Sequence, residues 1–292
     1  MEKVDIRTRK QHPVRIAVQF QPQHATYSDI RRAVHRAERL GVDAIFTWDH
    51  MTPVYGDPDG PSFECWATLA AWAEQTSSVQ IGPMVSCVNF RNPRMLGYLA
   101  RTTSDICGGR LLLGLGAGWL DTDFTELGRP VTGSGARIDA LAEALATITA
   151  TMHRHGSGES GTIPLMIGGT GPNKTMPLVA RYADVWHSFS TEEELPARLD
   201  RLHECCAEQG RDPDEIEIAV AVGGGNRNWR LPRAPQRWGE PLRRLGASLF
   251  TLSVGGPEYD LTQVGAWLRW RDAHNGSPPV TAPIDDTQHS RQ

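Results

Sequence analysis

The chain has 292 residues, with 30 Lys and Arg against 34 Asp and Glu, which gives a formal net charge of −4. Hydrophobic residues make up 39% of it and charged residues 22%, an ordinary globular mixture that excludes wholesale disorder. The mild acidity argues against a nucleic-acid-binding or anionic-membrane surface, because both need clustered Lys and Arg.

Cysteine usage and the hydropathy pattern predict a cytoplasmic protein. The five cysteines are an odd number and form no Cys-x-x-Cys pair, so we expect free thiols in a reducing compartment rather than a disulfide framework or a zinc site. No stretch approaches about 18 uninterrupted apolar residues, and residues 1–13 lack the apolar core of a secretion signal. We therefore expect neither a membrane span nor export.

Apolar strand-like runs and amphipathic helical patterns alternate along the chain. In the first unit, apolar residues at positions 30, 33, 34, 37 and 40 follow helical spacing, and Gly41 ends the pattern. We expect strands at residues 14–20, 43–48, 79–86, 110–116, 163–167, 183–187, 216–222 and 248–254. We expect helices at residues 29–40, 63–75, 93–107, 136–152, 173–182, 192–209, 240–245 and 259–271.

Eight strand–helix units predict an α/β fold with a parallel sheet and right-handed crossovers, for which a closed (β/α)8 TIM barrel is the natural solution. An open, doubly wound sheet is the alternative, but eight units without a break in composition favour closure. Residues 14–275 would then form a single domain, with flexible tails at residues 1–13 and 276–292.

In a parallel barrel, the residues just after each strand form the functional face. Trp48, Asp49 and His50 follow the second strand, and the Asp–His pair can titrate near neutral pH. A capping aspartate beside a solvated histidine is the alternative interpretation. In the third strand, Pro83 removes a ladder donor, which predicts a bulge or distorted backbone behind a ligand, although a simple strand end would also explain it.

Two glycine-rich segments follow the fourth and fifth strands. Glycines at 114, 116 and 118 would let a flat ligand lie against the backbone, whereas Trp119 replaces the third glycine of a dinucleotide-binding motif. Residues 168–171 lead directly into a helix, so their N–H groups and the Thr170 hydroxyl predict a phosphate site, with a flexible turn as the alternative. Glycines at 223–225 and 255–256, after the seventh and eighth strands, compete for this role.

Other kinds of catalytic site have little support. The first strand ends in Gln19, Gln21 and Gln23 with only His24 nearby, which is a poor set of metal ligands. The sequence contains no Gly-x-Ser-x-Gly elbow for a serine nucleophile.

Several of these segments together resemble the luciferase-like monooxygenase superfamily. They are residues 79–119 with the glycine-spaced end GLGAGW, the Trp48-Asp49-His50 triplet, the helix at 137–148 and residues 167–186. Within the superfamily, the sequence is most similar to actinobacterial enzymes that depend on the deazaflavin coenzyme F420. The resemblance runs in the right order over residues 14–186.

The resemblance implies a luciferase-like barrel whose carboxyl end holds a flavin-like ring, with F420 as the cofactor and FMN as the alternative. It implies that His50 is the acid or base, that Asp49 touches the cofactor, and that Trp48 and Trp119 line the substrate pocket. It also implies a non-prolyl cis peptide, within residues 83–85, that backs the ring. The further implied cofactor contacts are Pro83, Met84, Val85, Ser86, Gly116, Ala117, Gly118, Gly168, Gly169, Thr170 and Gly171.

The function expected from this resemblance is that of an F420-dependent oxidoreductase, which transfers a hydride between the deazaflavin and a small organic substrate by reducing C=C or C=N. An FMN-dependent monooxygenase and a cofactor-binding barrel without turnover are the alternatives. Trp119 stands where the sugar-phosphate dehydrogenases of the superfamily carry a catalytic glutamate, which argues against that activity. A homodimer is expected by analogy only.

Overall fold

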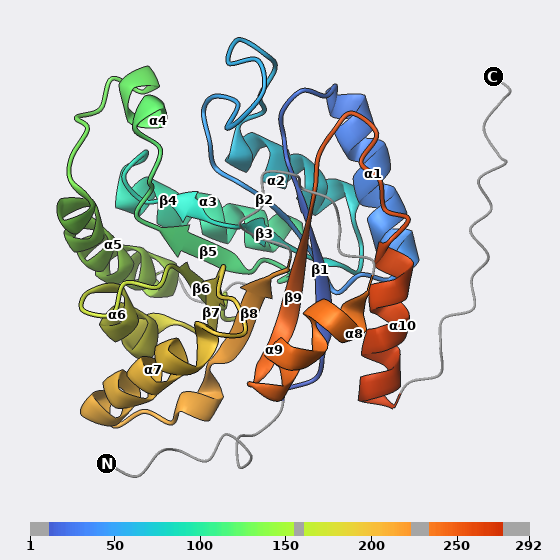
Figure 1. The fold of residues 1–292 in the computed structure, drawn as a ribbon. Coiled ribbons are helices and arrows are strands. Elements are labelled where there is room, and N and C mark those ends of the chain that lie inside the picture. The colour runs from blue at the N-terminus through green and yellow to red at the C-terminus, as the bar shows by residue number, and fades with distance from the viewer. Residues whose placement is uncertain (1–11, 155–160, 223–233, 277–292) are drawn as a thin grey trace, which may run out of the picture.

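The computed structural model describes residues 12–154, 161–222 and 234–276. All described strands belong to one parallel sheet with helices packed around it (Figure 1). The strands are β1 Arg15–Phe20, β2 Ala44–Thr47, β3 Gln80–Pro83, β4 Ser86–Cys87, β5 Leu113–Gly116, β6 Leu165–Gly168, β7 Val185–Ser188, β8 Glu217–Ala221 and β9 Ala247–Val254. The helices are α1 Tyr27–Leu40, α2 Cys65–Gln75, α3 Pro93–Ile106, α4 Asp121–Glu126, α5 Ser134–Arg154, α6 Thr175–Tyr182, α7 Leu195–Gln209, α8 Pro235–Trp238, α9 Glu240–Arg244 and α10 Val264–Asn275, with a 3-10 turn at Pro213–Glu215.

The sheet closes into a barrel through its third strand, which is divided in two. The strand order is β3-β2-β1-β9-β8-β7-β6-β5-β4, so β3 and β4 lie at opposite ends of the series. The Ile81 N–H donates to the Arg110 carbonyl (2.9 Å) and the Leu112 N–H donates to the Ile81 carbonyl (2.8 Å), which joins β3 to the segment leading into β5. The predicted (β/α)8 TIM barrel is therefore confirmed, with β3 and β4 as the two halves of its third strand.

The division corrects the continuous strand expected at residues 79–86. Pro83, which has no N–H for the ladder, is the last residue of β3. The next peptide bond, Met84–Val85, is cis, and β4 then resumes at Ser86 and pairs with β5. Both the distortion expected at Pro83 and the non-prolyl cis peptide implied by the family resemblance are present.

Local sequence signals set the boundaries of several helices. Thr26 and Asp29 form a capping box at the start of α1, and Gly41 ends that helix in the left-handed conformation, with φ of 83°. Asn92 caps α3 and Pro93 occupies its first turn, so the helix begins at residue 93, as predicted. By contrast, α4 and α8 have no counterpart among the predicted elements, because each is too short to carry a helical periodicity.

Apolar side chains fill both faces of the sheet. Large residues between the strands and the helices include Ile16, Phe20, Trp72, Trp186 and Trp267. The lumen of the barrel holds a second cluster that includes Ala17, Phe46, Leu112, Met166 and Leu249. At the amino end of the strands, Arg15 donates to Glu217 of β8 (2.9 Å) and to Gln80 of β3, and therefore spans the lumen. Since this end is filled, a ligand site is expected at the carboxyl end.

The tails predicted at residues 1–13 and 276–292 lie outside the described residues, apart from His12, Pro13 and Gly276. Gly276 ends α10 in the left-handed conformation. Of the helices in the described ranges, none is both long and apolar enough to cross a membrane. All five cysteines are buried, and none of them forms a disulfide bond.

Candidate active site

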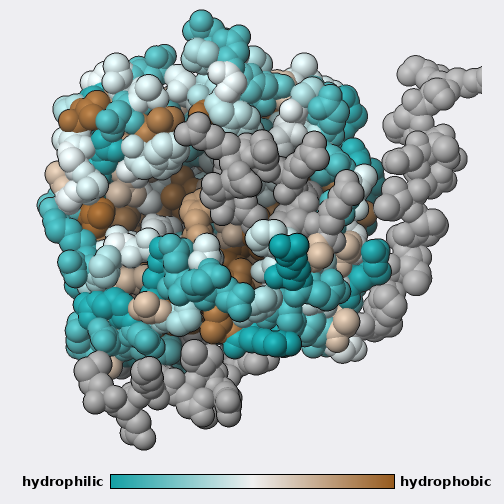
Figure 2. Space-filling view, in the orientation of Figure 1, coloured by the Kyte–Doolittle hydropathy of each residue, from teal (hydrophilic) through white to brown (hydrophobic). Residues whose placement is uncertain are grey.

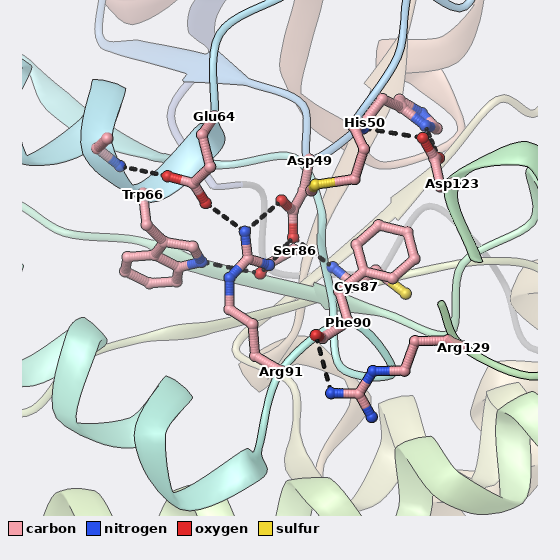
Figure 3. Close-up of polar contacts among 12 residues, drawn as sticks. Asp49, His50, Glu64, Trp66, Ser86, Cys87, Phe90, Arg91, Asp123 and Arg129 are labelled. Carbon is pink, nitrogen blue, oxygen red and sulfur yellow. Dashed lines mark hydrogen bonds and ion pairs between the residues drawn. The ribbon is translucent and has the colours of Figure 1, made fainter. Parts of the chain in front are cut away.

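The carboxyl end of the barrel carries α4 and the long loop after β2, which lie at the top of Figure 1. Trp48 and Asp49 follow β2 directly and contact different groups. The Trp48 ring packs edge-on against the rings of His50 and Tyr55, with centroids 5.6 and 6.3 Å away. Asp49 points instead toward Arg91, in the segment before α3 (Figure 3).

Asp49 is the centre of a buried polar network (Figure 3). Its carboxylate accepts two hydrogen bonds from the Arg91 guanidinium, at 2.6 and 2.8 Å, and one from the Cys87 N–H at 3.0 Å. The Ser86 hydroxyl donates to Asp49 at 2.9 Å and accepts from the Trp66 indole N–H at 3.0 Å. The network therefore fixes the backbone just after the cis peptide. Because these neighbours engage the side chains of Asp49 and Ser86, the cofactor contacts predicted for both residues stay predictions.

The charges in this network keep Arg91 ionised. Burial by itself lowers the pKa of the guanidinium, but the hydrogen bonds and charges of Asp49 and Glu64 outweigh burial and hold that pKa above its usual value. The Glu64 side chain is 42% exposed, whereas the Asp49 side chain is wholly buried. Water could therefore solvate the Glu64 carboxylate if Arg91 were lost, but it could not solvate the Asp49 carboxylate.

His50 forms a second polar pair with Asp123 of α4. Its Nδ1 lies 2.6 Å from Asp123 Oδ2, and the buried carboxylate also accepts a hydrogen bond from the Met51 N–H at 2.8 Å. A carboxylate beside Nδ1 favours the proton on that nitrogen. In the part of the chain that the structure describes, Nε2 has no hydrogen-bond partner. The pair thus holds an imidazole at the barrel mouth with one nitrogen free to exchange a proton.

Asp123 is the functional candidate that sequence reasoning missed. It lies in α4, a single short helix with the sequence DTDFTE and no periodic pattern. Arg137 of α5 holds this helix, because its guanidinium pairs with Asp121 and lies 4.3 Å from the centroid of the Phe124 ring. The only sequence signal was the pair of aspartates shortly after the glycine-spaced strand end.

The glycines of β5 and β6 make room for the third-strand segment. A Cβ at Gly114 would lie 2.1 Å from the Pro83 carbonyl oxygen, and a Cβ at Gly116 would lie 2.5 Å from Val85 Cγ2. At Gly168, a Cβ would lie 3.1 Å from Val85 Cγ1. The spacing of the glycines at 114, 116 and 118 predicted a ligand against bare backbone. The structure gives another reason, which is that Val85 leans across the lumen onto β5 and β6.

Replacing Gly116 with alanine is expected to destabilise the fold by about 1–3 kcal/mol, because the new methyl group overlaps Val85. Urea unfolding measures the cost. The Val85→Ala change removes the overlapping methyl groups, so the double variant should recover part of that loss. Gly133→Ala, where nothing lies within 4 Å, is the matched control and should change stability little. Equal costs at positions 116 and 133 would contradict this packing.

The segment after β5 carries three further predicted site residues. The Ala117 carbonyl accepts from the Asn89 amide at 2.9 Å, and Gly118 adopts a φ of 77° beside Cys87. Trp119 is 64% exposed, and its ring lies edge-on to His50, with centroids 5.6 Å apart. Trp48, His50 and Trp119 are thus brought together as predicted, and their roles stay predictions.

The predicted phosphate loop leads into α6, which begins at Thr175. Gly169 has φ of 129°, and its N–H donates to the His187 carbonyl at 3.2 Å. At the start of α6, the Thr175 and Met176 N–H groups both donate to the Gly171 carbonyl, at 3.1 and 3.0 Å, and Pro177 has no N–H, so this helix end offers little to an anion. Thr170 and Gly171 lie half-buried within the loop. Lys174 is already paired with Asp139 at 2.7 Å. Of the competing glycines, 223–225 lie outside the described residues, and a Cβ at Gly255 would lie 2.7 Å from Gln21 Oε1.

Three buried polar atoms near the carboxyl end have no partner among the described residues: Gln21 Oε1, Thr47 Oγ1 and Trp48 Nε1. Gln21 uses its other amide atom to donate to Ser253 at 2.9 Å, and Gln19 donates to the Met84 carbonyl at 3.0 Å. The described ranges contain no cluster of three or more His, Cys, Asp or Glu that could hold a metal ion. The mouth therefore offers hydrogen-bonding groups rather than metal ligands.

His187 of β7 is a buried titratable group that the sequence analysis did not single out. Its Nε2 lies 3.3 Å from the Thr251 hydroxyl, and its ring is edge-on to Phe189, with centroids 5.4 Å apart. Burial lowers the pKa of His187 to about 4, so the ring is neutral near pH 7.

This burial predicts a pH-dependent stability. Between pH 6.5 and about 4, the unfolded chain binds a proton at His187 that the folded chain excludes, so stability falls as the pH is lowered through this window. At pH 4.5 the wild type should have lost about 2–3 kcal/mol more, relative to pH 7, than His187→Gln. Urea unfolding of both proteins at the two pH values measures the difference. Parallel losses would show that His187 is not the group responsible.

The model of the luciferase-like monooxygenase family matches residues 11–223. The chain is 28% identical over 197 residues to a 5,10-methylenetetrahydromethanopterin reductase of Methanolobus tindarius, covering 63% of this chain and 57% of the reductase. It is 33% identical over 114 residues to an F420-dependent glucose-6-phosphate dehydrogenase of Amycolatopsis mediterranei, covering 39% and 32%. The chain thus spans less than two thirds of the length of these relatives.

Solved structures share the fold. An F420-dependent secondary alcohol dehydrogenase in complex with an F420–acetone adduct has a TM-score of 0.66 and 22% identity, covering 72% of this chain and 69% of that chain. The coenzyme F420 dependent tetrahydromethanopterin reductase of Methanopyrus kandleri has a TM-score of 0.65 and 15% identity, covering 85% and 96%. Since the family model covers most of the sequence, the chain belongs to the luciferase-like monooxygenase family.

Proposed function

We propose that this protein is an F420-dependent oxidoreductase that transfers a hydride between the deazaflavin and a small organic substrate. The observation that carries the proposal is the carboxyl end of the barrel, where the cis peptide segment with Val85 lies across the lumen and the His50–Asp123 pair lies at the mouth. The F420-dependent relatives named above support the choice of cofactor.

The residues present fit such a cofactor. Val85 and Met84 offer an apolar shelf for a flat ring. The unpartnered Trp48 Nε1 and Gln21 Oε1 are a donor and an acceptor for the polar edge of the ring. The glycine loop at 168–171, with the half-buried Thr170 and its hydroxyl, is the proposed place for the phosphate of the tail.

F420, when bound, supplies or accepts the hydride. The protein then has to orient the substrate and handle a proton. His50 is suited to the second task, because Asp123 fixes the ring through Nδ1 and leaves Nε2 free to give or take a proton. Asp49 acts indirectly in this proposal, since it holds Ser86 and Cys87, which follow the shelf. Reduction of a C=C or C=N bond needs one hydride and one proton, which the cofactor and His50 would supply.

The substrate in this proposal is not glucose 6-phosphate, although a relative is named for it. Trp119, which is large and cannot act as an acid, occupies the position that the family resemblance gives to a glutamate in sugar-phosphate dehydrogenases. An exposed indole also offers no charge partner for a phosphate group.

Titration of the full chain with F420 and, separately, with FMN tests the proposal, with cofactor fluorescence as the readout. We expect saturable F420 binding and much weaker FMN binding. Tight FMN binding without F420 binding would favour an FMN-dependent monooxygenase. F420 that binds but is neither oxidised nor reduced with any ketone, imine or enone tried would favour a barrel without turnover.

We further propose that the protein acts as a homodimer in the cytoplasm. The absence of disulfide bonds among the five buried cysteines is consistent with a reducing compartment. Met95, Tyr98 and Ile106 of α3 expose apolar surface that a second copy could cover. Sedimentation equilibrium gives the oligomeric state, and a monomer at micromolar concentration would contradict the dimer.

A further inference from the structure

Two large aromatic side chains follow strands at the carboxyl end of the barrel and are widely exposed. Trp119 follows β5 and is 64% exposed, and Phe189 follows β7 and is 57% exposed. They are the two most exposed aromatic side chains of the described residues. Figure 2 shows apolar residues within a hollow of the molecular face. Exposed aromatic surface at a ligand-binding rim is a feature of binding sites rather than of a stable core.

We propose that Trp119 and Phe189 form an aromatic clamp that binds a flat, conjugated ring system of the substrate. This inference rests on the proposed function, because the clamp would present such a substrate to the cofactor. Beyond the proposed function, it assigns a substrate class, namely planar unsaturated rings, and names the two residues that select this class.

Each clamp residue is held in place by a histidine at the mouth. The Trp119 ring is edge-on to His50, at 5.6 Å and 78°, and the Phe189 ring is edge-on to His187, at 5.4 Å and 87°. Edge-to-face pairs at these distances are favourable and orient both rings. The large exposed fractions leave ring surface uncovered, so each side chain is fixed by its histidine and still able to contact a ligand.

The sheet register sets the spacing of the clamp. The register places Leu115 of β5 beside Ile167 of β6, and Ile167 beside Trp186 of β7. Trp119 comes four residues after Leu115, and Phe189 comes three residues after Trp186. One strand therefore lies between β5 and β7, so the ends of these two strands are about 9.5 Å apart, twice the usual strand spacing. A planar ring stacked between two others needs about 7–8 Å, two van der Waals contacts. The spacing of the two strands therefore leaves room for one flat ring between side chains that follow them.

The intervening strand leaves the gap open. β6 ends at Gly168 and continues into Gly169, so two positions between the clamp residues carry no side chain. Val85 fills the space beside Gly168 lower in the lumen. A flat ligand held between Trp119 and Phe189 would thus stand above the same shelf on which the cofactor ring is proposed to lie, close to His50.

Calorimetric titration with two probes tests the clamp. 2-Naphthol is flat and aromatic, whereas decahydro-2-naphthol has the same ring count and hydroxyl but puckered, saturated rings. We expect 2-naphthol to bind the full chain at least about tenfold more tightly, and Trp119→Ala and Phe189→Ala each to weaken it by about tenfold. Trp119→Phe should keep most of the affinity. Trp238→Ala, which removes another exposed indole on α8, is the matched control and should change nothing.

The titrations are run without cofactor and with F420, so that the two proposals can fail separately. Equal affinity for the two probes, or unchanged 2-naphthol binding in both alanine variants, would overturn the clamp even if F420 binds. Selective 2-naphthol binding that both variants lose would support the clamp even in a protein that does not bind F420. In that case only the proposed function would be wrong.

Discussion

Replacing Asp49 with alanine is expected to destabilise the protein by about 3–5 kcal/mol, the usual cost of leaving the partner of a buried ion pair unpaired. The substitution removes both hydrogen bonds to Arg91 and those from Ser86 and the Cys87 N–H, all in a place that water does not reach. Urea or thermal unfolding, followed by circular dichroism, measures the loss.

The same arginine provides the control for this prediction. Glu64 also pairs with Arg91, but its side chain is 42% exposed, and it caps α2 by accepting from the Ala67 N–H, so Glu64→Ala should cost about 1–2 kcal/mol. Asp49→Asn keeps the shape and loses the charge, and we expect an intermediate cost. If Asp49→Ala were as stable as Glu64→Ala, the network would not be what holds the segment after the cis peptide.

The largest effect on turnover is expected for the His50–Asp123 pair. A positioned general acid or base contributes about 10²–10⁴-fold, so His50→Ala should lower kcat by about that factor. Asp123→Ala leaves the imidazole in place but removes the group bonded to Nδ1, and we expect a smaller loss of about 10–100-fold. F420 affinity should change by less than about threefold in either variant, because neither residue lies in the proposed phosphate loop. Steady-state kinetics with an identified substrate, together with F420 titration, separates the two effects.

The two residues should behave as a unit. The double variant should be about as slow as His50→Ala alone, because Asp123 acts only through the imidazole. Glu126→Gln changes an exposed carboxylate on the same helix and should leave kcat unchanged. Additive losses in the double variant would mean that Asp123 has a separate role, and an unchanged kcat in His50→Ala would make His50 a structural residue.

The barrel was predictable from the sequence because its signals are local and repeated. Residues 14–20, with the helical spacing that ends at Gly41, already contain one full unit, and Asn92 with Pro93 shows where another begins. The same is true of the distortion at Pro83, which follows from a missing N–H. The position of Trp48 and His50 on the functional face followed from the rule that such sites lie after parallel strands.

The contacts between elements could not be predicted in this way. Asp123 reaches His50 across 73 positions of the chain, from a helix too short to have a pattern. The spacing of the glycines at 114 and 116 predicted a surface for a ligand, but Pro83 and Val85 lie against these glycines. No single-sequence rule gives such a pairing, because it depends on how the distorted third strand crosses the lumen. His187 could not be identified as a buried titratable group for the same reason, because the sequence of a buried strand does not show whether a histidine points into the lumen or toward the helices.

A crystal structure of the protein with F420 bound tests the central claim most directly. The account predicts the deazaflavin ring at the carboxyl end of the barrel, against Met84 and Val85, on the side where His50 lies, with the phosphate at residues 168–171. A ring bound elsewhere, or a mouth that stays filled by Trp119 under saturating F420, would contradict it.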